Sequence, residues 1–275
     1  MLTTLLLAIA ISPQSGASCC DPMSSFAADP AFVAAHLAPL PMRFAARAGK
    51  NVSFRTSDGK TALGFYVPPA RKGAPGIVMV HEWWGLNDYI RREAERLHDE
   101  LGYGVLAVDL YEGKVATTPQ EAGKLMQAVR PDRAKAIVHG AVNALKDGEL
   151  GNRFAKVGSI GWCFGGGWSL QAAIQGGPAV KACVMYYGMP DTDPADLKRL
   201  KAPVLLVWAT RDGWINKGVV DGFKTAMANA KKPLTVLPFD ADHGFANPSN
   251  PKYDKVSGDK AWQATISFYK THLGK

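Results

Sequence analysis

The sequence predicts an α/β fold with a mostly parallel central sheet, an antiparallel N-terminal hairpin and helices on both faces. Short apolar runs alternate with helical patterns along the chain. Most of these runs lack the alternation of apolar and polar residues that marks a strand with one solvent-exposed face. A length of 275 residues with 47% hydrophobic side chains allows a substantial core. We expect a single domain over residues 50–275, preceded by a segment of different composition.

The antiparallel hairpin is expected over residues 52–56 and 62–67, because both stretches are β-prone and the turn between them contains Asp58-Gly59. Six later runs have the continuous apolar character of strands that are buried on both sheet faces. These runs are residues 76–81, 105–110, 157–161, 180–187, 204–209 and 234–239.

Helical patterns fill the connections between these runs, as parallel strands require. They cover residues 88–100, 119–145, 164–175, 217–230 and 258–272. The second of these helices is expected to break near Arg130-Pro131, because proline disfavours helical backbone at the residue before it.

The first residues predict a signal peptide over 1–18, followed by an N-terminal extension over 19–49. Residues 2–11 are almost wholly apolar, no charge precedes Asp21, and small residues at 15–18 suit a cleavage site. We therefore expect export to the periplasm or the exterior, and a cytoplasmic protein if the segment is not a functional signal. The apolar run is too short for a stable membrane span, which needs about 20 residues.

The distribution of charge along the chain argues against a nucleic-acid partner. The net charge of +8 comes from separated Lys and Arg residues without a long basic run, so no nucleic-acid partner is expected. We expect a monomer or a weak dimer. Four cysteines do not make a disulfide framework, and Cys183 lies in a buried-strand pattern. Cys19 and Cys20 could be exposed thiols, form an intermolecular disulfide, contact a metal or carry a lipid.

A candidate nucleophile lies in Gly161-Trp162-Cys163-Phe164-Gly165, between an apolar strand and a small-residue helix. This arrangement matches the nucleophile elbow of an α/β-hydrolase, with cysteine where serine is usual. The glycines relieve crowding around a strained turn that raises the nucleophile above the sheet. The pattern therefore indicates covalent catalysis by the Cys163 thiol.

Asp212 and His243 supply the remaining members of a triad. They follow Cys163 in the chain order of nucleophile, acid and base that this fold uses, and each comes just after a predicted strand. Because parallel strands end at one edge of the sheet, we expect the three side chains to meet there. His81, Glu82 and Asp109 are expected near the same edge.

Four motifs resemble the dienelactone hydrolase family, whose members include carboxymethylenebutenolidase, over about residues 50–275. They are residues 81–87 (HEWWGLN), 161–166 (GWCFGG), 209–212 (ATRD) and 242–245 (DHGF). The resemblance implies a Cys-His-Asp triad of Cys163, His243 and Asp212. It also implies that Glu82 contacts the thiol, and that the backbone N–H of Trp83 joins that of Phe164 in an oxyanion hole.

The chemistry of a thiol agrees with this assignment. A cysteine with a pKa of about 8.5 is only slightly ionised at neutral pH, so a neighbouring base must remove its proton. His243 would act as that base, and Asp212 would fix its tautomer. A carboxylate beside the thiolate would disfavour ionisation, so we expect the resting thiol to stay protonated. The family resemblance implies that Glu82 moves to take the thiol proton when substrate binds. The alternative role of Glu82 is a helix N-terminal charge or an arginine partner.

The expected pocket is aromatic, with Trp83 and Trp214 as its walls. Family members that open dienelactone hold its carboxylate with arginines, one of which follows the catalytic histidine where this chain has Asn247. An asparagine cannot make a bidentate ion pair, so we expect a small ester or lactone other than dienelactone. Arg211 and Arg133 could compensate, although no pattern places either in the pocket.

Other candidates fit structural roles better. Ser159 and Ser169 are expected in the core, and His98 and His139 on helix surfaces. His36 is expected to be peripheral, as is the C-terminal His272. His81-Glu82 lacks the second histidine of a zincin helix, so neither a metal nor an organic cofactor is expected. The alternative function is a thiol redox or sensing protein that oxidises Cys163 and the Cys19-Cys20 pair.

Overall fold

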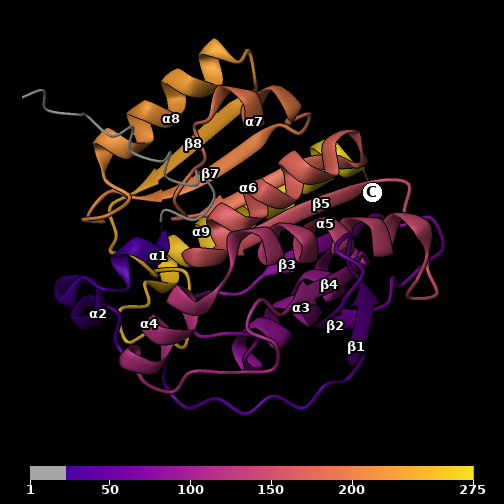
Figure 1. Cartoon of the computed structure of the whole chain (residues 1–275), viewed down its shortest axis with the longest axis horizontal. Helices are drawn as coiled ribbons and strands as arrows, with labels where there is room; N and C mark the ends of the chain where they lie inside the picture. Colours follow the sequence, from indigo (N-terminus) through magenta and orange to yellow (C-terminus); the bar gives the residue numbers. More distant parts are fainter. Residues whose placement is uncertain (1–22, 275) are drawn as a thin grey trace, which may run out of the picture.

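The computed structural model describes residues 23–274, so the predicted signal peptide and Cys19-Cys20 lie outside the described residues. Eight strands form the sheet: β1 (Lys50–Arg55), β2 (Thr61–Val67), β3 (Gly76–Val80), β4 (Gly104–Val108), β5 (Val157–Trp162), β6 (Val180–Tyr186), β7 (Val204–Ala209) and β8 (Leu234–Phe239). Their order is β1-β2-β4-β3-β5-β6-β7-β8 (Figure 1). β2 is antiparallel to β1 and β4, and the other pairs are parallel.

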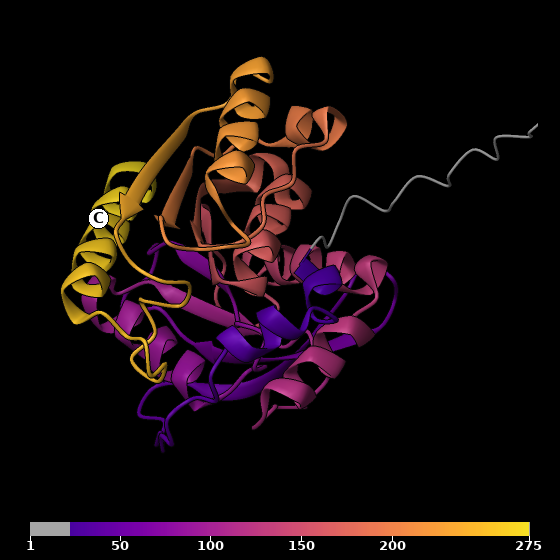
Figure 2. The same cartoon turned by 90° about the vertical axis from the view of Figure 1, so that its left-hand side faces the viewer.

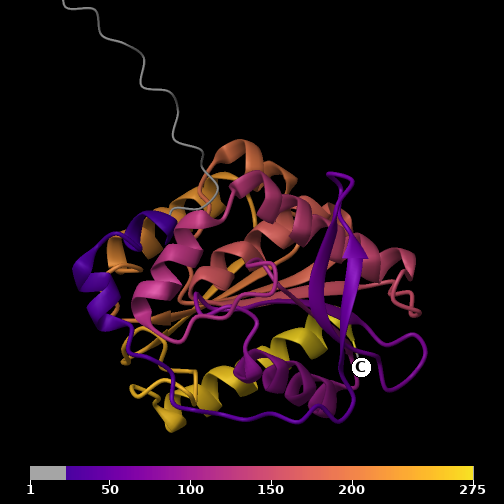
Figure 3. The same ribbon diagram turned by 60° about the horizontal axis from the view of Figure 1, so that its bottom comes forward.

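The helices are α1 (Met23–Phe26), α2 (Pro30–Ala35), α3 (Asp88–Leu101), α4 (Pro119–Ala128), α5 (Pro131–Asp147), α6 (Phe164–Gly176), α7 (Pro194–Arg199), α8 (Lys217–Asn229) and α9 (Lys255–Leu273), with a 3-10 turn at Gly177–Ala179. α3 and α9 cover one face of the sheet (Figure 3). α5, α6, α7 and α8 pack in succession over the other face. Among the described residues, no helix is long and apolar enough to cross a bilayer.

The predicted architecture is confirmed, including the antiparallel hairpin and the break between α4 and α5. Each expected strand lies within two residues of an observed one. β3 to β7 are almost entirely buried, as expected for strands covered on both faces. The same expectation was wrong for β8, which lies at the edge of the sheet and has no fully buried residue. Three short helices were not predicted, namely α1, α2 and α7, because four to six residues are too few to show a helical period.

The N-terminal extension packs against the α/β unit. α1 and α2 contact α4, and α1 also reaches α6, beside the ends of the parallel strands (Figures 1 and 2). Met23 and Phe32 are completely buried in these contacts. Farther along, the backbone N–H groups of Arg47, Ala48 and Gly49 donate to one oxygen of Glu95 on α3. The extension thus runs across the edge of the sheet where the candidate residues lie.

Candidate active site

Cys163 occupies a strained turn between β5 and α6. Its φ of 55° and ψ of −121° are costly for a residue with a side chain, which is the conformation expected of a nucleophile elbow. The Cys163 N–H donates to the carbonyl of Tyr186 at 3.0 Å. A Cβ on Gly161 would lie 2.0 Å from the carbonyl oxygen of Gly165, so β5 and α6 approach too closely for any other residue.

Gly165→Ala should destabilise the protein by about 3 kcal/mol, the upper range for overpacking a core. The added Cβ would lie 2.3 Å from the His81 carbonyl oxygen and 2.4 Å from that of Val80, and backbone atoms cannot rotate away. Gly222→Ala on exposed α8 meets no atom within 4 Å and should instead be neutral or stabilising. Urea unfolding of both variants tests this, and equal midpoints would contradict the tight approach of α6 to the end of β3.

Asp212 and His243 form the expected pair beyond β7 and β8. Oδ1 of Asp212 accepts from the backbone N–H groups of Trp214 and Ile215 at 2.9 and 3.0 Å. Oδ2 lies 2.5 Å from Nδ1 of His243. Burial would raise the pKa of the Asp212 carboxyl, but His243 and the backbone donors together lower it below its usual range. Asp212 is therefore a carboxylate that holds a proton on Nδ1 of His243.

His243 presents its other nitrogen to the thiol. A ring nitrogen of His243 and Sγ of Cys163 lie within 4.8 Å of each other, and Nε2 is buried without an oxygen or nitrogen partner among residues 23–274. Burial would lower the pKa of the imidazole, but Asp212 and Cys163 outweigh it and raise that pKa well above its ordinary value. The surroundings of His243 therefore stabilise an imidazolium that has accepted a proton.

Glu82 lies at the same edge, with its carboxylate held by Asn247. Nδ2 of Asn247 donates to Oε2 of Glu82 at 2.5 Å, while Oδ1 of Asn247 accepts from the backbone and hydroxyl of Ser249, each at 2.7 Å. Burial raises the pKa of Glu82 to about 7, although Asn247 and His243 oppose the rise. A carboxyl group with this pKa can exchange a proton near neutral pH.

Glu82→Gln should change stability in a pH-dependent way. Ionised Glu82 is disfavoured in the folded state, so its contribution to stability is present below about pH 4.5 and is lost as pH rises through about 7. The free energy of unfolding of Glu82→Gln, relative to that of wild type, should rise by on the order of 2–3 kcal/mol between pH 4.5 and pH 8.5. Denaturant unfolding at both pH values measures this, with Glu112→Gln as an exposed control. A constant difference would contradict a buried acid.

His36 lies in the site, so the expectation that it is peripheral was wrong. It directly follows α2 and is 8% exposed, and its Nε2 lies 3.9 Å from Sγ of Cys163. Nδ1 lies 2.7 Å from the carbonyl oxygen of Phe32 and must donate to it. Burial and the neighbouring His243 lower the pKa of His36 to about 3, so the ring is neutral. The sequence signal that was missed is Asp29-Pro30, a typical helix start. It begins the short helix α2, which ends directly before His36.

Aromatic rings surround the thiol, as expected for Trp83 and Trp214. The Phe32 ring makes edge contacts with both, at centroid distances of 5.4 and 5.1 Å. The His36 ring lies 4.6 Å from the ring of Trp83. Asp29 accepts from the indole N–H of Trp214 at 3.3 Å, which ties α2 to this wall. These contacts cover Cys163, which is 2% exposed.

Two backbone groups lie where an oxyanion hole is expected. Phe164 is the first residue of α6, and the first N–H groups of a helix have no partner within it. The Trp83 N–H shares its peptide with the Glu82 carbonyl, which accepts from Nδ1 of His81 at 2.5 Å and from the N–H of Gly85 at 3.3 Å, so this peptide is held in place. The Phe164 side chain itself is buried, so only its backbone can serve the site.

His81 and Asp109, the other titratable residues expected at this edge, form hydrogen bonds with backbone groups. His81 is fully buried, with Nδ1 at 2.5 Å from the carbonyl of Glu82 and Nε2 accepting from the N–H of Leu110 at 3.0 Å. Asp109 accepts from two backbone N–H groups in the turn after β4. Both residues therefore support the edge of the sheet and do not face the thiol.

The core assignments for the serines and Cys183 are confirmed. Ser159 donates to the carbonyl of Ser169 at 2.9 Å, and Ser169 donates to the carbonyl of Val184 at 2.9 Å. Burial raises the pKa of the Cys183 thiol to about 11, which makes it an inert neutral group. None of these three side chains is accessible to substrate.

Both candidate arginines pair with acids on the surface. Arg211 contacts Asp240 at 2.8 Å and Asp242 at 3.0 Å, and its side chain is half exposed. Arg133 donates to Thr56 and Asp58 beside the hairpin. Neither guanidinium is available to hold a substrate carboxylate at Cys163.

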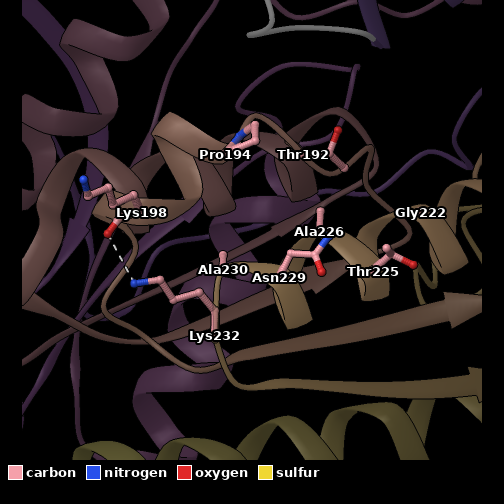
Figure 4. Close-up of a pocket in the computed structure, with 9 residues that line it drawn as sticks. All are labelled: Thr192, Pro194, Lys198, Gly222, Thr225, Ala226, Asn229, Ala230 and Lys232. Atoms are coloured by element: carbon pink, nitrogen blue, oxygen red, sulfur yellow. Dashed lines mark hydrogen bonds between the residues drawn. The ribbon is translucent and has the colours of Figure 1, made fainter.

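A separate surface pocket of about 650 Å³ lies between α7 and α8 (Figure 4). Pro194 and Lys198 line one side, Thr225 and Asn229 the other, and Lys232 lies at the end. The Lys232 ammonium donates to the carbonyls of Lys198 and Leu200. Cys163, Asp212 and His243 do not line this pocket.

Comparison with known proteins finds one family over most of the chain. The sequence model of the dienelactone hydrolase family matches residues 63–273. Protein usf of Aquifex pyrophilus is 32% identical over 233 residues, covering 82% of this chain and 99% of that protein. A putative carboxymethylenebutenolidase of Aquifex aeolicus is 30% identical, with the same coverage. Carboxymethylenebutenolidase of Pseudomonas putida is 27% identical and covers 80% of this chain and 95% of that protein.

Solved structures show the same fold. A dienelactone hydrolase-like promiscuous phosphotriesterase from metagenomic libraries has a TM-score of 0.72 at 24% identity, covering 83% of this chain and all of that one. A putative dienelactone hydrolase of Klebsiella pneumoniae has a TM-score of 0.69 at 22% identity, covering 82% and 100%. The α/β-hydrolase fold is thus confirmed. The family match starts at residue 63, so α1, α2 and His36 precede it.

Proposed function

The chain belongs to the dienelactone hydrolase family, and on that premise we propose that it hydrolyses a small ester or lactone through a thioester on Cys163. The observation that carries this proposal is the elbow thiol beside His243, whose other nitrogen is held by Asp212. The relatives named carboxymethylenebutenolidase favour hydrolysis over the redox alternative.

Attack begins when the Cys163 thiol loses its proton to Nε2 of His243. Sγ then forms a bond to the carbonyl carbon, and the carbonyl electron pair moves to the oxygen. The resulting oxyanion would accept from the N–H groups of Phe164 and Trp83, each worth about 10²–10³ in rate by analogy with known oxyanion holes. The imidazolium returns its proton to the leaving oxygen, and water then hydrolyses the thioester with His243 as base.

Glu82 is proposed to control the protonation of the thiol. Its buried carboxyl disfavours a second negative charge nearby, so the resting thiol stays protonated. A substrate that displaces the contact with Asn247 would move the Glu82 carboxyl away from the thiol, so that His243 can take the thiol proton. Asn247 was first expected to bind substrate. In this proposal it also holds Glu82 until substrate arrives.

The surroundings of Cys163 favour an uncharged acyl group. Asn247 stands where an arginine was sought, and Arg211 and Arg133 are both paired with surface acids. The rings of Phe32, Trp83 and Trp214 instead provide apolar surface. Because Cys163 is 2% exposed, substrate reaches it only when part of this cover moves.

A panel of aryl esters and small lactones, in matched forms with and without a carboxylate, tests the proposed substrate class. The purified reduced protein should turn over the uncharged forms with at least about tenfold higher kcat/KM, since a buried unpaired carboxylate costs well over 1.4 kcal/mol. A preference for the carboxylate forms would show that an unrecognised cation serves the site. Absence of turnover across the panel would contradict the proposed substrate class.

We also propose that residues 1–18 direct export and that residues 50–275 form the hydrolase domain. The support is the uncharged apolar start of the sequence and the family match from residue 63. Cell fractionation followed by N-terminal sequencing tests export. A protein that retains Met1 in the cytoplasm would contradict it.

A further inference from the structure

His36, Cys163 and His243 form a cluster that hydrolysis does not require in full. Their ligand atoms all lie within 4.8 Å of one another, and this is the only such group of three metal-binding side chains found within residues 23–274. His36 comes from the segment before the family match, so the cluster exists only because the N-terminal extension covers the site. We propose that these three residues bind a zinc ion, which masks the nucleophile.

The donor set has the chemistry that zinc prefers. Zinc takes thiolate and imidazole ligands, usually four in a tetrahedron, and a site with three protein ligands leaves one position for water. With Zn–S and Zn–N bonds of about 2.3 and 2.0–2.1 Å, two ligand atoms on one zinc lie roughly 3.3–3.6 Å apart. Sγ of Cys163 and Nε2 of His36 are 3.9 Å apart, so small side-chain rotations suffice for this pair.

Both imidazoles are already oriented as metal ligands. Nδ1 of His36 faces the Phe32 carbonyl and Nδ1 of His243 faces the Asp212 carboxylate, so each must donate there. In the neutral form of each ring, Nε2 therefore carries the lone pair, and these nitrogens face the thiol. A carboxylate or carbonyl on the far nitrogen is the usual support of a histidine that binds metal.

The buried Nε2 of His243 and the charge balance of the site both suit a cation. Nε2 of His243 is buried without an oxygen or nitrogen partner among the described residues, and its ring is 9% exposed. Zinc with one thiolate and two neutral imidazoles carries a net charge of +1, which the adjacent Asp212 carboxylate balances. Zinc would hold Cys163 as an unreactive thiolate and fasten His36, and with it α2, over the site.

Zinc titration of the full-length protein tests the proposal without requiring activity. Cys19→Ser and Cys20→Ser are introduced first, so that those thiols do not compete for metal. With a chromophoric chelator as competitor, this parent should bind one zinc per chain. His36→Gln and Cys163→Ser should each weaken binding at least ~100-fold, as loss of a ligand should exceed the 10–100-fold effect of a supporting residue. His98→Gln on α3 is the control and should bind as the parent does.

Two readouts keep the outcome decisive. Saturating zinc should slow alkylation of Cys163 by iodoacetamide at least ~10-fold in the parent but not in His36→Gln, measured by peptide mass. Cobalt added to the parent should give the intense visible bands of a four-coordinate ion and a thiolate charge-transfer band, which needs no folded variant. Absence of zinc binding, or equal affinity in the parent and a folded His36→Gln, would overturn the site. Absence of the cobalt bands would do the same.

Discussion

Cys163→Ala should lower kcat for ester or lactone hydrolysis by at least about 10⁴, since it removes the atom that forms the covalent bond. The residual rate would come from binding and the oxyanion donors alone. KM should change little, because Sγ contributes little to ground-state binding. Steady-state kinetics on the best substrate of the panel measure both constants.

Cys183→Ala is the matched control for this loss. Cys183 is also buried, but it lies in β6 and contacts Ser169 instead of the catalytic residues. Its replacement should leave kcat within about threefold of wild type while lowering stability by about 1 kcal/mol through the small cavity. Full activity in Cys163→Ala, or equal losses in both variants, would contradict a nucleophilic role for Cys163.

Asp212→Asn should lower kcat by about 10³–10⁴, the range seen when a triad acid loses its charge. The backbone N–H groups of Trp214 and Ile215 would donate to the amide oxygen of the new side chain. The amide NH₂ would then face Nδ1 of His243 and force the proton onto Nε2. In that tautomer the ring cannot accept the proton of the Cys163 thiol.

Asp242→Asn provides the comparison, because Asp242 adjoins His243 in sequence but pairs with Arg211 on the surface. It should change kcat by less than about twofold. The pH profile adds a second readout, since loss of Asp212 should move the acidic limb of kcat/KM that reports His243. A similar, small effect of both substitutions would mean that Asp212 does not set the tautomer of His243.

The sequence was sufficient to predict the fold and the placement of Cys163, Asp212 and His243 at one edge of the sheet, because the signals were strong and independent. Continuous apolar runs predicted β3 to β8, and Pro131 predicted the break between α4 and α5. The elbow glycines at 161 and 165 predicted the close approach that the structure shows. Chain order then brought Cys163, Asp212 and His243 together, since parallel strands end at one edge.

Contacts made by irregular segments could not be read from local patterns. His36 looked peripheral because α2 has only six residues, and its position depends on burial of Phe32 between distant tryptophans. The hydrogen bond of Asn247 to Glu82 joins residues 165 positions apart in sequence. Such contacts follow from tertiary packing, which leaves no period in the sequence.

Mass spectrometry of the enzyme quenched during turnover of a slowly hydrolysed ester tests the central claim most directly. The account predicts that the peptide containing Cys163 gains the mass of the acyl group, and that the adduct disappears as the substrate is exhausted. Its mass should be absent from Cys163→Ala treated in the same way. Rapid turnover without this adduct, or an acyl group on another residue that decays at the catalytic rate, would contradict a thioester at Cys163.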